Sequence, residues 1–168
     1  IKKIVVSISE KSILLRNIFR KTINIIRYIQ YKLNTAFIKV DEKTIIFCSF
    51  NGKSYSCSPK AIYLYMLNNK KYKDYKFIWA FKEIDKYKEL EKENNTTLVE
   101  MKSKDYKKYL AKAKYWIFNY KVPDYLYPKK NQIFVQCWHG TPLKRLGCDL
   151  EHFDNVLNTM KGMKKRYK

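Results

Sequence analysis

The sequence contains little glycine, proline or cysteine, with 4 of each in 168 residues. So little glycine and proline excludes collagen-like and low-complexity chains. The cysteines lack CxxC spacing, which excludes a zinc site and a disulfide framework and favours a reducing cytoplasm; they are Cys48, Cys57, Cys137 and Cys148. No uncharged apolar run reaches the roughly 18 residues that a membrane-spanning helix needs, so none is expected.

Acidic residues are also scarce, because 15 Asp and Glu face 36 Lys and Arg and leave a net charge of +21. A field of this sign attracts polyanions such as nucleic acid, anionic lipid or a phosphate-rich substrate. Codon bias in an AT-rich genome explains the many lysines equally well, so the charge alone leaves the partner open. The hydrophobic share of 46% and the aromatic share of 16% predict one folded domain, with or without an arm.

Several ligand-binding and catalytic motifs are missing. There is no Walker A loop, no GxGxxG after the first predicted strand, no HExxH and no GxSxG. The sequence therefore predicts neither a metal site nor a cofactor. The chain begins with Ile1 rather than Met, and no closing strand follows Asp149. These ends lead us to expect a fragment of a longer protein.

Residues 12–34 are predicted to form one amphipathic helix. Arg16, Arg20 and Arg27 lie on its polar face. The opposite arc is apolar and consists of Leu14, Leu15, Ile18, Phe19, Ile25, Ile26, Ile29 and Leu33. A broad apolar face opposite a basic face is typical of a helix lying on an anionic membrane. Packing against a protein core or against a missing second domain is the equally weighted alternative.

From residue 44 onward, short apolar strands alternate with amphipathic helices. The predicted strands are 44–50, 75–81, 96–101, 115–120 and 132–138, and the helices between them are 58–69, 84–93 and 104–113. The first of these helices is expected to start with Ser58 as N-cap and Pro59 as N1, with Ile62, Tyr65 and Met66 toward the core. This order predicts an α/β fold with an open, doubly wound, Rossmann-like parallel sheet whose strands are covered on both faces. Ligands bind such sheets at the carboxyl ends of the strands, which here lead into loops 51–58, 119–128 and 139–149.

His139 is the candidate catalytic residue, because it follows the fifth predicted strand. Gly140 leaves room beside the imidazole ring, and Pro142 suits the first turn of a following helix. The free amides of that helix, with Lys144 and Arg145, would suit a phosphate. An imidazole beside bound phosphate could act as general base for an attacking hydroxyl, although a lone histidine is more often structural or solvent-exposed.

Other polar residues carry weaker signals. His152 has no such context and is expected on a surface helix. Lys53 and Lys60 could meet phosphate but more simply are solvated. Asn119 and Asp124 follow the fourth strand and could bind hydroxyl groups, although ordinary loop polarity explains them as well.

The segment QCWHGTPLKRLG at 136–147 closely resembles the QxWHGTPLKxLG signature of the CDP-glycerol glycerophosphotransferases, which are teichoic acid primases and polymerases. Residues 51–63, 76–79 and 113–119 resemble the first loop and helix, the second strand and the fourth strand of that family. The resemblance covers about residues 44–149, and its WHGTPLK run is the most specific part.

This resemblance implies the amino-terminal half of a GT-B fold. Residues 1–40 would be a basic amphipathic helix region and 41–168 a Rossmann-like acceptor-side domain, with the donor-binding domain absent. It also implies His139 as the base, with substrate contacts from Asn119 and from residues of the motif: Trp138, Gly140, Thr141, Pro142, Lys144 and Arg145. No metal is implied.

The implied partners are CDP-glycerol, bound mainly by the missing half, and a lipid-linked glycerol phosphate acceptor. An anionic membrane surface would be met by Arg16, Arg20 and Arg27, at the cytoplasmic face of the plasma membrane. A ribitol-phosphate or sugar transferase of the same fold remains an alternative, as does a basic domain that binds membrane or nucleic acid without catalysis. Nucleic acid ranks low, because strands that are apolar on both faces leave no exposed aromatic platform.

Overall fold

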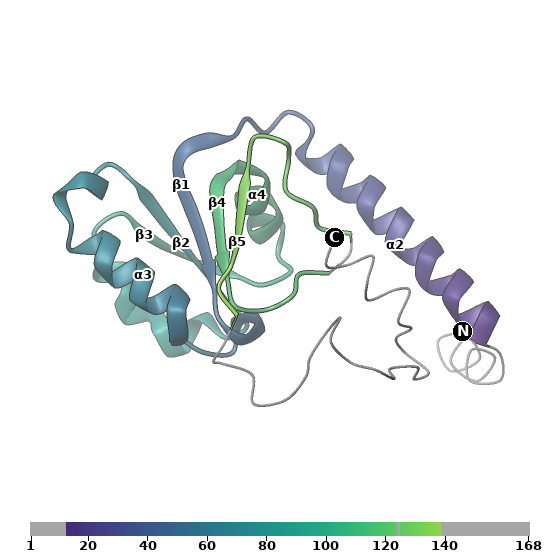
Figure 1. Cartoon of the computed structure of the whole chain (residues 1–168), viewed down its shortest axis with the longest axis horizontal. Coiled ribbons are helices and arrows are strands. Elements are labelled where there is room, and N and C mark those ends of the chain that lie inside the picture. The colour runs from purple at the N-terminus through teal and green to yellow at the C-terminus, as the bar shows by residue number, and fades with distance from the viewer. Residues whose placement is uncertain (1–12, 124, 139–168) are drawn as a thin grey trace. The chain divides into compact units, whose positions relative to one another are not determined.

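The computed structural model of this chain describes residues 13–123 and 125–138. Its elements, in chain order, are α2 (Ile13–Thr35), β1 (Asp41–Cys48), η1 (Phe50–Gly52), α3 (Cys57–Leu67), η2 (Lys70–Tyr72), β2 (Lys76–Phe81), η3 (Ile84–Lys92), β3 (Thr96–Glu100), α4 (Lys104–Lys112), β4 (Ala113–Phe118) and β5 (Ile133–Gln136). The chain divides into two compact units, and all five strands lie in the unit formed by Ile23–His139. That unit is described here by itself (Figure 1).

The five strands form one parallel sheet in the order β3-β2-β1-β4-β5. In the central register, Phe47 of β1 lies between Trp79 of β2 and Ile117 of β4. The chain first winds outward from β1 through β2 to β3, then returns to the other side of β1 with β4 and β5. The predicted doubly wound sheet is therefore confirmed, and its switch point lies between β1 and β4.

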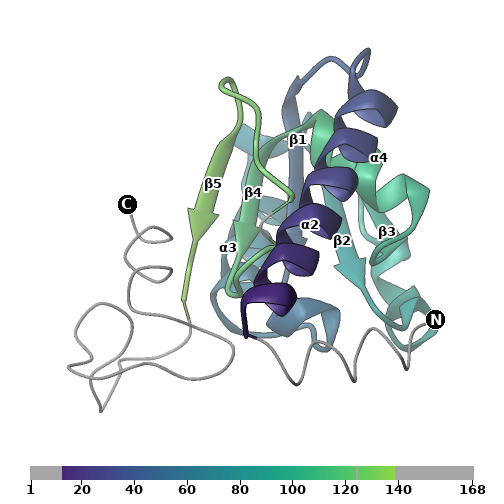
Figure 2. The ribbon, with the colours of Figure 1, turned by 90° about the vertical axis from the view of Figure 1, so that its right-hand side faces the viewer.

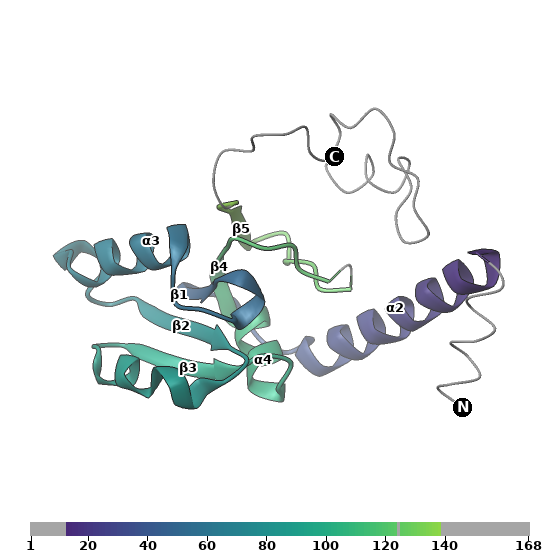
Figure 3. The same ribbon diagram turned by 90° about the horizontal axis from the view of Figure 1, so that it is seen from below.

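Alternate residues of β1, β2, β3 and β4 face two separate clusters. Ile46 and Cys48 face a cluster that includes residues of α2 and α4, whereas Ile45 and Phe47 face a cluster built with α3 and η3. Figures 2 and 3 show α4 on one face of the sheet and α3 on the other. Period-two alternation in a doubly covered sheet explains why nearly every residue of the central strands is apolar.

The second half of α2 turns its polar side toward the sheet unit. Tyr31 and Thr35 are buried, and the Thr35 hydroxyl donates a hydrogen bond to the Tyr31 carbonyl oxygen at 2.6 Å. Leu33 points away and is 71% exposed. The other apolar residues of this stripe, Ile25, Ile26 and Ile29, are each about half exposed. Helix α2 therefore does not pack its predicted apolar arc against the sheet.

The start of α3 differs from the prediction. Ser56, not Ser58, is the N-cap, and Cys57 opens the helix with a φ of 63°. Tyr63 is fully buried and its hydroxyl lies 2.9 Å from the Thr96 hydroxyl, while Tyr65 is 63% exposed. The prediction that Tyr65 faces the core was wrong, because the buried arc runs through positions 59, 63 and 66.

The short helix predicted at 84–93 is present as a 3-10 helix. It is interrupted at Tyr87, whose ring stacks on Phe81 with centroids 4.1 Å apart. The prediction that every strand is covered on both faces fails for β5, where Ile133 and Val135 are exposed. Among the described residues, β5 stands at the edge of the sheet, and only its Phe134 packs against a cluster. Within the described part of the chain, no helix is long and apolar enough to cross a membrane.

Candidate functional site

At the switch point between β1 and β4, the loop after β1 contacts the residue that follows β4. The side-chain oxygen of Asn119 accepts a hydrogen bond from the backbone N–H of Phe50 at 2.7 Å. Asn119 is completely buried, although it stands at the end of an apolar strand. Because a buried amide must satisfy its polar atoms, this side chain ties the two loops together at the edge where doubly wound sheets bind ligands.

The loop after β1 has an unusual backbone. Phe50, Asn51 and Gly52 have consecutive positive φ angles of 46°, 57° and 73°. Positive φ is costly for a bulky residue such as phenylalanine, and such strain persists only where surrounding contacts enforce it. The Asn119 hydrogen bond is one such contact. Another is the bond from the Ser49 hydroxyl to the Ser56 carbonyl oxygen at 2.7 Å, which closes the loop.

Both the limited space around position 52 and its positive φ angle require a glycine there. A Cβ atom at this position would lie 2.3 Å from the Met101 sulfur, which is far inside van der Waals contact. The carbonyl oxygen of Gly52 also accepts a hydrogen bond from the backbone N–H of Lys82 at 2.8 Å. The loop is therefore held by residues that follow β2, β3 and β4, so its shape is set by the sheet beneath it.

The described cysteines differ in their surroundings. The pKa of the Cys57 thiol is lowered by a hydrogen bond from the Asn119 side chain, and further by the backbone N–H of Ser58. Burial raises the pKa of Cys48 to about 12, and burial also raises that of Cys137. Of these three, only Cys57 has a stabilised thiolate form, and it lies on the loop that Asn119 holds.

Trp138 is the one residue of the WHGTPLK run that the structure describes. The backbone N–H of Cys137 donates to the Phe118 carbonyl oxygen at 2.7 Å, which extends the pairing of β5 with β4. Trp138 follows with a φ of 56°, and its N–H donates to the Gln136 side chain at 3.2 Å. The chain is thereby carried to the edge where Asn119 lies. Asp124 and the predicted residues from position 139 onward lie outside the described residues; the latter are His139, Gly140, Thr141, Pro142, Lys144, Arg145 and His152.

Other predicted residues are found in varied settings. The Lys60 ammonium lies 4.6 Å from the centre of the Tyr55 ring, and the Lys53 carbonyl oxygen accepts a hydrogen bond from the Tyr87 hydroxyl. The Arg27 guanidinium lies 5.6 Å from the centre of the Tyr125 ring, so it faces this unit. Arg20 is exposed, and the Arg16 side chain is outside the described residues. Among the side chains that the structure describes, none form a group of three or more that could hold a metal ion.

The sequence did not single out Phe50, Gly52 or Cys57 as functional. Gly52 and Cys57 fall within the predicted ligand loop 51–58, whereas Phe50 was assigned to the strand before it. The role of Asn119 was predicted as a direct contact with an acceptor hydroxyl, and that contact stays a prediction. Its observed bond to Phe50 spans 69 positions in the sequence, which no local pattern reveals.

Comparisons with known proteins place this geometry in context. A family model described as "CDP-Glycerol:Poly(glycerophosphate) glycerophosphotransferase" matches residues 29–168. A teichoic acid poly(glycerol phosphate) polymerase of Staphylococcus epidermidis is 40% identical over 145 residues, which are 80% of this chain and 19% of that protein. A teichoic acid glycerol-phosphate transferase of Staphylococcus aureus is 33% identical over 157 residues, covering 90% of this chain and 38% of that one.

Solved structures of similar proteins indicate the same family. The wall teichoic acid polymerase TagF matches with a TM-score of 0.68 and 36% identity, over 90% of this chain and 37% of that one. A variant of the same polymerase soaked with CDPG matches with a TM-score of 0.69 and 35% identity. The expected Rossmann-like sheet of the GT-B class is confirmed. The chain spans less than two fifths of the length of each of these relatives.

Proposed function

Because this chain belongs to the CDP-glycerol:poly(glycerophosphate) glycerophosphotransferase family, we propose that it is the acceptor-side part of an enzyme that builds teichoic acid. The enzyme moves glycerol phosphate from CDP-glycerol to a lipid-linked glycerol phosphate acceptor. The observation that carries this proposal is the family match over residues 29–168, which includes the WHGTPLK run. The CDPG-soaked relative supports CDP-glycerol as the donor.

In the proposed reaction, His139 acts as general base. Its imidazole takes the proton from the terminal hydroxyl of the acceptor, and the oxygen attacks the β-phosphorus of CDP-glycerol. A new phosphorus–oxygen bond forms as the bond to the α-phosphate oxygen breaks, and CMP leaves with that electron pair. The backbone amides that follow Pro142, together with Lys144 and Arg145, neutralise the charge on the phosphates. Trp138, Gly140 and Thr141 shape the space around the ring.

The described residues support this placement in one respect. The Cys137 bond to Phe118 brings Trp138 to the carboxyl edge of the sheet, next to the loop that Asn119 holds. This is the edge at which a doubly wound sheet binds its ligand. A loop that is held rigidly from three sides offers a preorganised surface for an acceptor, which lowers the entropic cost of positioning its hydroxyl.

The domain organisation is part of the proposal. Residues 41–168 form the acceptor-side domain and residues 1–40 a basic helical region, while the donor-binding domain is contributed by residues outside this sequence. The solved relatives are long enough to hold such a second domain, since the chain covers 37–38% of them. Which polyol the donor carries depends on that other domain.

We further propose that the enzyme binds the cytoplasmic face of the membrane through α2. The apolar stripe of the helix faces away from the sheet unit, with Leu33 71% exposed. Lys32 lies beside this stripe on the helix, whereas Arg20 lies opposite the stripe, on the polar face. An outward apolar stripe on a helix whose polar residues are basic suits an anionic bilayer, whereas a helix that served only this domain would turn its apolar side inward.

The test of the reaction is replacement of the proposed base in the full-length protein. His139→Ala should lower turnover of CDP-glycerol with a lipid-linked acceptor by about 10²–10⁴-fold, the usual contribution of a general base. His152→Ala is the matched control and should retain activity. Release of CMP measures turnover, and a thermal melt confirms that both variants fold. Wild-type activity in the His139 variant would remove the assignment, and an inactive wild-type protein that still binds anionic vesicles would favour a membrane-binding domain without catalysis.

A further inference from the structure

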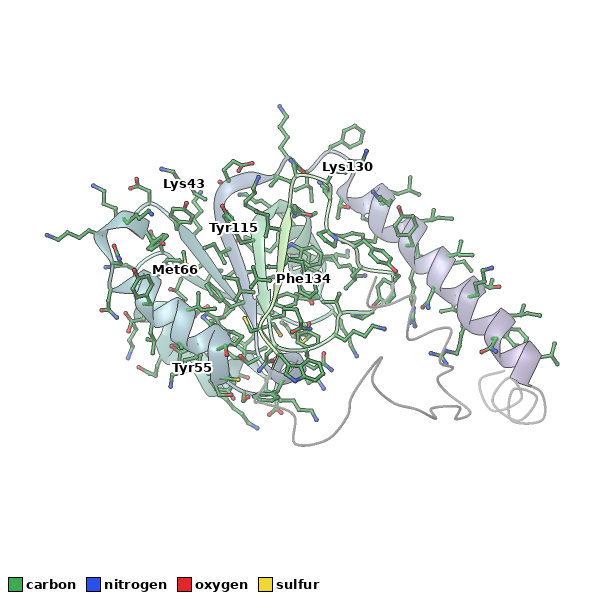
Figure 4. All side chains as sticks on the ribbon, in the orientation of Figure 1. Lys43, Tyr55, Met66, Tyr115, Lys130 and Phe134 are labelled. Carbon is green, nitrogen blue, oxygen red and sulfur yellow. The ribbon has the colours of Figure 1, made fainter. Side chains whose placement is uncertain are left out.

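A second surface lies at the opposite edge of the sheet from the proposed active site. The segment between α3 and β2 carries Lys70, Lys71 and Lys73, and Lys76 starts β2. Lys43, on β1, is one residue before the position that pairs with Lys76. Figure 4 shows Lys43 and Lys130 at the amino ends of the strands and Tyr55 at the other end. The lysines therefore gather far from the loop that Asn119 holds.

The carboxylates at this edge do not balance the lysines. Lys43 pairs with Asp74 at 3.3 Å, and Lys76 lies 4.0 Å from Asp41. In the described part of the chain, the other three lysines of this cluster, Lys70, Lys71 and Lys73, make no ion pair. The surface keeps an excess of positive charge. Exposed ion pairs are weak, so an incoming polyanion could also compete for Lys43 and Lys76.

A shallow hollow of about 640 Å³ lies beside these lysines, and its lining is Leu64, Tyr65, Asn68, Asn69 and Lys70. Its shape is held by hydrogen bonds: the Asn69 amide donates to the Tyr65 hydroxyl at 3.3 Å, and its oxygen accepts from the backbone N–H of Lys71 at 3.0 Å. The Tyr65 and Tyr72 rings meet edge to face, with centroids 6.3 Å apart. The hollow thus combines amide and hydroxyl groups with neighbouring ammonium groups.

This chemistry fits a chain that alternates hydroxyl-bearing and phosphate-bearing units. Lysine ammonium groups bind phosphates as point charges, and amide and phenol groups bond hydroxyls. We propose that this hollow and the lysines around it dock the already polymerised part of the poly(glycerol phosphate) acceptor. The proposal rests on the proposed function. The occupant is the polymer rather than a bilayer, because Leu64 is the only aliphatic residue of the lining and it is only 38% exposed.

The position of the hollow makes acceptor length important. Helix α3 begins at the loop of the proposed active site and ends at the hollow, and its 11 residues span about 16 Å. A short acceptor can reach only the active site. An acceptor long enough to cross this distance engages both places, and the second contact raises its effective concentration at the first. Long acceptors should therefore bind more tightly than short ones, and more so at low salt.

The test compares two charge-reversed pairs in the full-length protein. Lys70→Glu with Lys71→Glu alters the hollow, and Lys107→Glu with Lys108→Glu on α4 is the control on the other face of the sheet. Steady-state kinetics use CDP-glycerol and water-soluble glycerol phosphate oligomers of increasing length. The wild-type KM should fall with acceptor length. The hollow variant should lose this gain, with about a tenfold higher KM for long acceptors, while kcat and the KM for short acceptors stay unchanged.

Each other outcome overturns the proposal. A wild-type KM that is independent of length removes the second contact, and an equal rise in the control pair shows a general effect of net charge. If the hollow variant keeps the length dependence but loses binding to vesicles of anionic lipid, the surface docks a membrane instead. Turnover of short acceptors by the wild-type protein distinguishes failure of this inference from failure of the proposed function. If short acceptors are turned over normally and acceptor length has no effect on KM, only this inference fails. If the wild-type protein turns over no acceptor, the proposed function fails as well.

Discussion

Replacement of Asn119 by alanine tests whether this residue holds the loop at the proposed active site. The change removes the acceptor of the Phe50 N–H and the side chain that lowers the pKa of the Cys57 thiol. Leaving the part-buried Phe50 N–H unpaired costs about 1–3 kcal/mol, and the atoms deleted from the fully buried Asn119 side chain add about 1 kcal/mol. Relaxation of the strained Phe50 backbone returns about 1 kcal/mol. We expect a net loss of about 2 kcal/mol in the free energy of unfolding.

Two local measurements separate this role from general destabilisation. Hydrogen exchange should show that the Phe50 amide loses its protection in Asn119→Ala, while amides of β1 keep theirs. Alkylation by iodoacetamide, followed residue by residue with mass spectrometry, should show that the pKa of Cys57 rises, because the hydrogen bond that stabilises its thiolate is gone. At neutral pH Cys57 should therefore react more slowly than in wild type.

The matched control is Asn95→Ala. Asn95 also makes a side-chain hydrogen bond, to the Lys73 carbonyl oxygen at 2.7 Å, but it is exposed and lies at the opposite edge of the sheet. This variant should leave the alkylation of Cys57 unchanged. If Asn119→Ala also leaves the pH profile of Cys57 and the protection of Phe50 as in wild type, then Asn119 does not hold this loop and the reasoning is refuted.

Three further predictions concern the loop, the buried thiol and the helix. Gly52→Ala should cost about 2–4 kcal/mol in denaturant unfolding, because its Cβ meets Met101 and its φ is positive; adding Met101→Ala should recover only the part due to the clash. Stability should fall as pH rises above 9, because burial raises the pKa of Cys48 to about 12 and the unfolded thiol loses its proton first; Cys48→Ala should flatten this decline, and an identical slope would contradict it. Ile25→Ser with Ile29→Ser should weaken binding to anionic vesicles at least tenfold without changing the melting temperature, since each side chain is already 49% exposed; unchanged vesicle binding would remove α2 from the membrane contact.

Local patterns in the sequence were sufficient for the fold class and for the family. Apolar runs of strand length alternating with amphipathic helices predict a parallel sheet, because a strand that is buried on both faces needs apolar residues at nearly every position. All five predicted strands are present with ends displaced by at most three residues, as 44–50 against Asp41–Cys48 illustrates. The WHGTPLK run identified the family without any structure, because it is a contiguous motif.

Tertiary structure alone decided which groups meet. The sequence wheel of α2 could not tell that the side with Tyr31 and Thr35 would face the domain, since an amphipathic helix can bury its apolar side in its own core or present it to another surface. Nor could it place Asn119 against Phe50, because that contact depends on β4 returning to lie beside β1. Strand order is set by the whole sheet, whereas sequence patterns record only the burial of neighbouring residues along the chain.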